Sequence, residues 1–111
     1  MKVKTIPEKL RINRFNYDLY KREGDVAILR QELVEGEVYA FEVHIVRKMP
    51  ILESKLDYLE RIRQAGFTHV EVLASNELFG TYGWAYRYLE EAERKFKELV
   101  EAQEKNKRMV A

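Results

Sequence analysis

The chain has 111 residues, of which 46% are hydrophobic and 12% aromatic, and its 20 basic and 19 acidic side chains nearly cancel. This composition indicates one folded domain over residues 1–111 and gives no bulk reason to expect nucleic acid, membrane or acidic partners. The absence of cysteine excludes disulfides, thiol catalysis and a cysteine-based zinc site, and because no apolar run is long enough to cross a bilayer, we expect a cytoplasmic protein.

The first half of the chain has the pattern of strands joined by turns. Residues 1–13 mix basic and apolar side chains around Pro7 and are expected to form a loosely anchored leader. From residue 15, hydrophobic and polar positions alternate, and glycine-containing turns near residues 24 and 36 separate three apolar segments. These segments predict an antiparallel meander.

The third predicted strand, residues 38–47, has two distinct faces. One face is fully hydrophobic and is expected to contribute to the core, because Tyr39, Phe41, Val43 and Ile45 share it. The other face is mixed and consists of Ala40, Glu42, His44 and Val46.

After Pro50 the hydrophobic residues recur with helical spacing. Pro50 suits a first helical turn and Gly66 suits the position just past a helix end, so a helix is predicted over about 51–65. Residues 67–74 return to alternation and predict a fourth strand. Ser75 is expected to cap a short helical turn that Gly80 ends.

The segment from Ser75 to Tyr86 holds the only tryptophan and two glycines, and it allows two interpretations. Residues 82–86 form a fifth strand, which their aromatic content favours, or the last helix begins near Thr81, which the missing cap at Arg87 favours. The body of that helix is predicted to extend over about 88–105, and residues 101–111 are expected to form a polar, fraying tail. The fold class is therefore α+β, with an antiparallel sheet of four or five strands and both helices packed on one face.

Candidate catalytic groups are few. His44 and His69 each lie two positions from an acidic residue, Glu42 and Glu71 respectively, and could act as a metal pair or a general base. A metal site needs a third ligand, and the sequence shows no suitable spacing. Both histidines are therefore expected to be solvent-facing strand residues, and we predict no catalytic residue, metal or cofactor.

Two sets of residues are candidates for binding. The aromatic side chains are expected to belong mainly to the core, but some could form a protein contact: Tyr82, Trp84, Tyr86 and Tyr88. Basic residues near the N-terminus and the strand ends are the alternative, as a nucleic-acid patch: Lys9, Arg11, Arg14, Lys21, Arg22, Arg47 and Lys48.

The motif Asn76-Glu77-x-Phe79-Gly80-x-x-Gly83-Trp84-x-Tyr86, within a similar layout from Phe15 to Leu99, resembles a group of small uncharacterised proteins from phages and mobile elements. In that group the segment around the tryptophan is expected to form a short strand, which favours a fifth strand here. The resemblance implies no established activity.

Three functional hypotheses follow. The first is a non-enzymatic accessory protein that binds a protein partner, for example a host or defence complex. The second is a nucleic-acid-binding module that uses the basic residues. The third, less favoured, is an enzyme that uses His44 and His69. The open edge of a small sheet also favours a symmetric homodimer.

Overall fold

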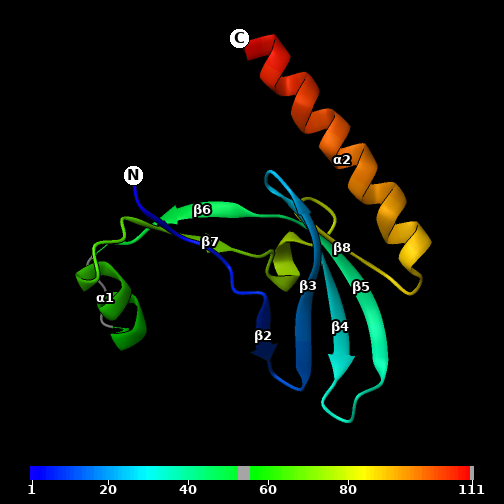
Figure 1. Cartoon of the computed structure of the whole chain (residues 1–111), viewed down its shortest axis with the longest axis horizontal. Coiled ribbons are helices and arrows are strands. Elements are labelled where there is room, and N and C mark those ends of the chain that lie inside the picture. Colours follow the sequence, from blue (N-terminus) through cyan, green and yellow to red (C-terminus); the bar gives the residue numbers. More distant parts are fainter. Residues whose placement is uncertain (53–55, 111) are drawn as a thin grey trace.

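The computed structural model describes residues 1–52 and 56–110 and shows an α+β fold built on two sheets (Figure 1). The larger sheet is antiparallel and has five strands, in the order β2 (Lys9–Ile12), β3 (Phe15–Glu23), β4 (Val26–Leu33), β5 (Val38–Ile45) and β8 (Gly83–Tyr86). The predicted meander and the predicted fifth strand over 82–86 are thus confirmed.

A second, smaller sheet was not predicted. Its three strands are β1 (Val3–Lys4), β7 (His69–Val72) and β6 (Arg47–Pro50), in that order. β1 pairs with β7 in parallel, whereas β6 pairs with β7 in antiparallel register. Pro50 was expected to begin a helix, but it ends β6 opposite His69. Proline is compatible with this position because β6 is an edge strand.

The helices occupy opposite ends of the molecule in Figure 1. α2 (Leu89–Val110) packs against β4, β5 and β8, and its C-terminal part extends beyond the sheet. α1 (Asp57–Gln64) lies beside the smaller sheet, because β6 carries the chain away from the larger one before this helix begins. Of the two helices predicted to pack on one face, only α2 therefore covers the larger sheet.

The helix boundaries differ from the predicted ones. α1 is shorter than the predicted 51–65, and residues 53–55 of that range lie outside the described residues. A short 3₁₀ helix, η1 (Asn76–Leu78), follows Ser75 as predicted, although the Ser75 side chain makes no capping hydrogen bond. α2 continues to Val110, so residues 101–110 are helical and do not form a frayed polar tail.

Both faces of the larger sheet are covered. On the helix face, α2 buries a purely hydrophobic cluster consisting of Val26, Ile28, Val43, Ala92 and Phe96. On the opposite face a second cluster forms around Tyr17, Ala27, Leu29 and Val46. The central strand β4 contributes alternate residues to the two clusters. This explains its continuous hydrophobic run.

The N-terminal segment is part of this cover. Residues 1–13 were expected to be a loosely anchored leader, but β1 pairs with β7 and β2 pairs with β3. Ile6 and Leu10 pack against the cluster on the opposite face. The leader prediction was therefore wrong, because paired backbone and partly buried side chains hold this segment in place.

Tyr39, predicted to lie on the core face of β5, is displaced from it by a β-bulge. The register between β4 and β5 shifts after Gln31, so that Tyr39 has no partner on β4. The Tyr39 ring instead lies 5.3 Å from that of Phe15, between ring centroids, and its side chain is 59% exposed. Simple alternation fails here because a bulge inserts one extra residue into the strand.

Candidate functional site

A row of buried polar side chains crosses the opposite face of the larger sheet. We call it the polar row; it consists of Gln31, Tyr17, Glu42 and His44. Gln31 Nε2 donates to the Tyr17 hydroxyl at 2.8 Å, and this hydroxyl lies 3.5 Å from Glu42 Oε2. His44 Nε2 lies 2.8 Å from Glu42 Oε1. All four are buried, with Glu42 9% and His44 1% exposed.

Strand register brings these residues together. Tyr17 on β3 lies directly opposite Gln31 on β4, while Glu42 and His44 alternate along β5 on the same face. His44 lies opposite Gly83 of β8. A side chain at Gly83 would place its Cβ 2.8 Å from the Cβ of Ala74, so glycine allows the chain at Ala74 to pack closely over this end of the row.

The hydrogen bonds define the charge of the polar row. The backbone N–H of Ala74 donates to His44 Nδ1 at 3.1 Å, so Nδ1 carries no proton and the ring donates through Nε2 to Glu42. The imidazole is therefore neutral. Burial, and then the negative charge of Glu42, raise the pKa of the Tyr17 phenol, which stays protonated. Glu42 accepts two hydrogen bonds, and both come from neutral groups.

An ion pair joins the two sheets near the polar row. Arg22 of β3 donates to both carboxylate oxygens of Glu71 on β7, at 2.7 and 2.6 Å, and the backbone N–H of Ile6 adds a third bond at 3.1 Å. These hydrogen bonds, Arg22 first, hold the pKa of Glu71 below its ordinary value, and the same pair raises the pKa of Arg22. We call this contact the Arg22–Glu71 clasp.

A groove of about 760 Å³ lies between the sheets, with the polar row along its floor. Its walls are mostly hydrophobic and include Ile6, Leu10, Phe15, Leu73 and Phe79. The Phe79 ring meets the His44 ring edge to face, at 5.6 Å between centroids. The groove therefore combines a hydrophobic enclosure with convergent polar groups, the usual character of a ligand site.

The catalytic candidates are only partly brought together. His44 and Glu42 contact each other, and His44 is buried, so its predicted solvent exposure was wrong. His69 does not line the groove and contacts Thr68, while Glu71 faces Arg22. Within residues 1–52 and 56–110, no group of three metal-ligating side chains is found.

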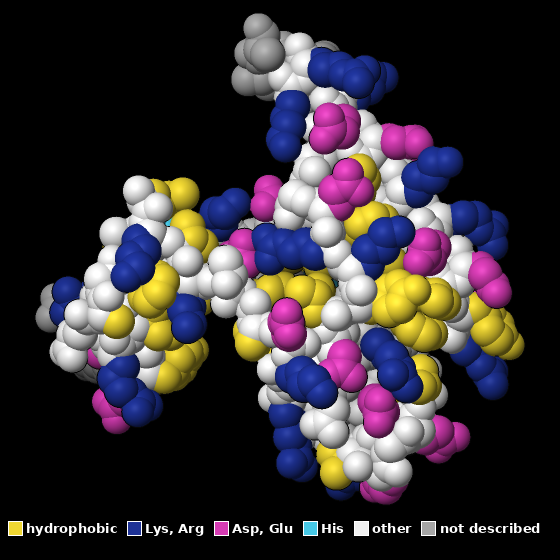
Figure 2. Space-filling model, in the orientation of Figure 1, with side chains coloured by type: hydrophobic (Ala, Val, Ile, Leu, Met, Phe, Trp, Pro, Cys, Tyr) yellow, Lys and Arg dark blue, Asp and Glu magenta, His cyan; other side chains and the backbone are white. Residues whose placement is uncertain are grey.

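The predicted basic residues do not form one patch. Several bond to carboxylates: Lys9 to Asp18, Lys21 to Glu93, Arg22 to Glu71 and Lys48 to Asp25. The Arg47 guanidinium lies over the Tyr82 ring, 4.9 Å from its centroid. Arg11 and Arg14 line a small hollow together with Glu35 and Glu37. Figure 2 shows Lys and Arg interspersed with Asp and Glu on one face of the molecule.

The aromatic candidates gather at β8 and its two ends. Trp84 and Tyr86 are half-buried; Tyr86 packs on the helix-face cluster, and the Lys95 ammonium lies 4.3 Å from the Trp84 ring centroid. Tyr82 is half-buried, and Tyr88 is 57% exposed. The structure thus gives three of these rings a packing role and leaves Tyr88 open to solvent.

The outer edge of β8 carries backbone groups that face away from the sheet. The N–H of Ile45 donates to the carbonyl of Tyr82, which sets the alternation: Trp84 and Tyr86 bond toward β5, whereas Gly83 and Ala85 point outward. The Gly83 carbonyl accepts from Gly80. At Ala85 no described residue pairs with the outer edge. A hollow of about 540 Å³ lies on the other side of Ala85, toward β5, and is lined there by Val38, Tyr39 and Ala40.

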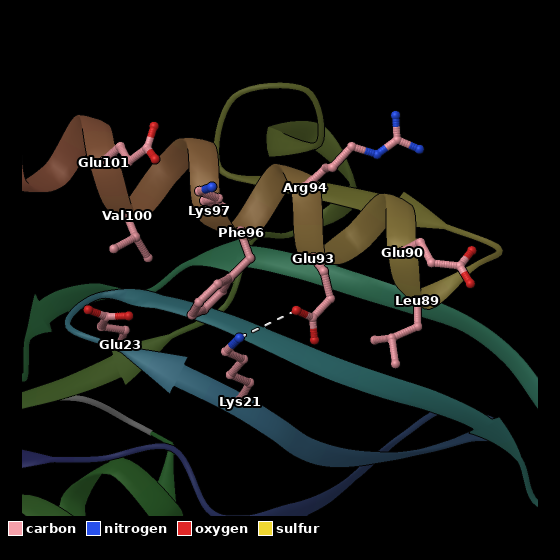
Figure 3. Close-up of a pocket in the computed structure, with 10 residues that line it drawn as sticks. All are labelled: Lys21, Glu23, Leu89, Glu90, Glu93, Arg94, Phe96, Lys97, Val100 and Glu101. Carbon is pink, nitrogen blue, oxygen red and sulfur yellow. Dashed lines mark hydrogen bonds and ion pairs between the residues drawn. The ribbon is translucent and has the colours of Figure 1, made fainter.

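A third concave surface runs between α2 and β3. Figure 3 shows Phe96 directed toward the strands, with Lys21 beneath it bonded to Glu93, while Arg94 and Glu90 point outward. The Lys21 ammonium lies 4.9 Å from the Phe96 ring centroid. This furrow has a hydrophobic floor and a charged rim, and the Lys21–Glu93 pair lies within it at 3.4 Å.

Comparison with protein-family models, with curated proteins and with solved structures gives no match for this chain. The resemblance to phage and mobile-element proteins therefore stays a prediction. Among the described residues, no helix combines the length and the hydrophobicity needed to cross a membrane.

Proposed function

We propose that the protein is a non-enzymatic accessory module that binds a protein partner by accepting an extended strand of that partner at the edge of β8. The observation that carries this proposal is the free backbone edge at Ala85. Unpaired N–H and C=O groups at a sheet edge are a template for a further strand, and proteins commonly bind extended peptides in this way.

The surroundings of Ala85 support an added strand. The hollow on the β5 side of Ala85 is lined by Val38 and Tyr39, both of which expose large hydrophobic side chains that a partner crossing β8 would reach. Tyr88 is exposed just beyond the end of β8. In strand addition, backbone hydrogen bonds provide affinity, and side-chain hollows beside the edge provide specificity. A host or defence complex, the example given with the first functional hypothesis, is our proposed source of the strand.

The test is an affinity capture with wild-type protein and two variants at one position. Ala85→Pro removes the outward N–H and leaves the pairing with β5 intact, and proline is tolerated on an edge. Ala85→Thr keeps the N–H and is the matched control, since Ala85 is exposed. Wild type and Ala85→Thr should retain the same partner from a nuclease-treated lysate, and Ala85→Pro should lose it.

The outcomes separate the competing functions. Retention of the same partner by a folded Ala85→Pro variant would contradict binding at β8. A partner that disappears after nuclease treatment would favour the nucleic-acid alternative instead. A concentration-dependent dimer that only Ala85→Pro dissociates would identify the added strand as that of a second copy of this chain.

A further inference from the structure

The groove between the sheets holds a negative charge with which no described lysine or arginine forms an ion pair. Glu42 is 9% exposed and its two hydrogen-bond donors, Tyr17 and His44, are both neutral. Within the described parts of the chain, no lysine or arginine forms an ion pair with it. Burying a carboxylate without a cation is costly, because neutral donors replace only part of its hydration.

The carboxylate of Glu71, in contrast, is neutralised by a side chain of the same protein. Glu71, at the end of the same groove, receives two bonds from Arg22 and one from a backbone N–H. Among the residues that the structure describes, Glu42 has no such partner, and the groove above it is open. The contrast indicates that the positive group for Glu42 comes from outside the chain.

The shape of the groove limits which kind of molecule could carry the positive group that pairs with Glu42. A volume of about 760 Å³ lies within the usual range of small-molecule sites. Its aromatic and aliphatic walls, Phe15, Phe79, Leu10 and Leu73 among them, favour a flat or compact hydrophobic body. Polar side chains also line the groove away from its floor, Lys4, Asn13 and Asn76 among them. The buried ones on the floor include Glu42 and Gln31, which orient one polar end of a ligand.

We propose that this groove is a binding site for a small organic cation: an amidinium, guanidinium or primary ammonium group on a hydrophobic body, with the cationic end on Glu42. The site is separate from the β8 edge, so this inference does not depend on the proposed partner binding. Phe79 covers one side of the bound group, and the Tyr17 hydroxyl adds a hydrogen bond to its charged end.

The experiment uses benzamidinium and its neutral analogue benzamide, which have nearly the same size and shape. Each is titrated into the native, full-length protein, with affinity measured by calorimetry and location by the amide NMR signal of Ala74, which bonds to His44. Benzamidinium should bind at least about tenfold more tightly than benzamide, because only the cation makes charge-assisted hydrogen bonds. It should also shift the Ala74 signal.

Two variants test whether the carboxylate of Glu42 is the group that binds benzamidinium. Glu42→Gln should weaken benzamidinium binding by about tenfold or more and leave benzamide unchanged. Glu37→Gln, which removes the same charge from an exposed position outside the groove, should bind like wild type. If Glu42→Gln does not fold, the comparison of the two probes on the wild-type protein still decides the matter.

The proposal would be overturned by equal affinities for benzamidinium and benzamide, by no benzamidinium binding at about 10 mM, where even a very weak site would be detected, or by unchanged binding to a folded Glu42→Gln variant.

Discussion

The two faces of the larger sheet are both buried, but by different chemistry. The helix face is closed by α2 alone, and its cluster of Val26, Ile28, Val43, Ala92 and Phe96 contains no polar side chain. The opposite face is covered by the N-terminal segment and by Leu73, which follows β7, and it contains the polar row of Gln31, Tyr17, Glu42 and His44. The helix face is a closed hydrophobic core, whereas the opposite face combines a hydrophobic cluster with buried polar side chains and an open groove.

This difference separates stability from recognition within one sheet. A hydrophobic cluster under a long helix stabilises the fold without needing exact partners, since burial is non-directional. Buried polar groups require complete hydrogen bonding, and an incomplete network leaves a binding opportunity.

The helix face should contribute most to stability. Phe96→Ala removes a buried ring from the centre of the cluster, and we expect a loss of about 3–5 kcal/mol in the free energy of unfolding, measured by urea denaturation. Tyr88→Ala, at an exposed position, is the control and should change stability by less than about 0.5 kcal/mol. Similar small effects at both positions would show that α2 does not close a core.

The Arg22–Glu71 clasp should be the main link between the sheets. Glu71→Ala leaves a largely buried guanidinium without its partner, and we expect a loss of about 3 kcal/mol in the same assay. The matched control is Glu93→Ala, which breaks the exposed pair with Lys21 and should cost less than about 1 kcal/mol. Equal losses would mean that the clasp behaves as an ordinary surface ion pair.

Replacing a residue of the polar row by a hydrophobic one should lower the stability of the fold. His44→Leu removes the acceptor of the Ala74 N–H and one donor to Glu42, so we expect a loss of about 1–3 kcal/mol although a hydrophobic residue has entered a buried site. Thermal unfolding followed by circular dichroism is suitable. A variant more stable than wild type would show that the hydrogen bonds of His44 contribute little.

Acid should weaken the opposite face before the helix face. The pKa of Glu71 is lowered in the folded protein, so its contribution is present above the ordinary value of about 4.3 and is lost as the pH falls through the folded value. The stability difference between wild type and Glu71→Gln should therefore narrow as the pH falls below about 4. A stability difference between wild type and Glu71→Gln that stays constant down to low pH would contradict this dependence on the ionisation of Glu71.

The sequence predicted what depends on local periodicity. The meander and the body of α2 follow from alternation or helical spacing over many residues. The strand that contains Trp84 was one of two interpretations, favoured by its aromatic content and by the resemblance. The bulge that displaces Tyr39 has no comparable pattern. The smaller sheet was missed because β1 has only two residues and pairs with β7, which lies far along the chain.

The polar row was missed for a related reason. Alternation correctly placed Glu42 and His44 on one face of β5, but their polarity indicated solvent. Burial of that face depends on the N-terminal segment and on Leu73, which no local pattern brings to it. Tyr17 and Gln31 were not predicted as site residues, although the hairpin of β3 and β4 places them opposite each other.

The most direct test of the polar floor is the tautomer of His44, measured by long-range proton–nitrogen NMR correlations at neutral pH. The contacts of His44 predict a single neutral ring with hydrogen on Nε2, because Nδ1 accepts from the Ala74 N–H and Nε2 donates to Glu42. A ring that carries hydrogen on both nitrogens, or one that exchanges between the two tautomers, would contradict it.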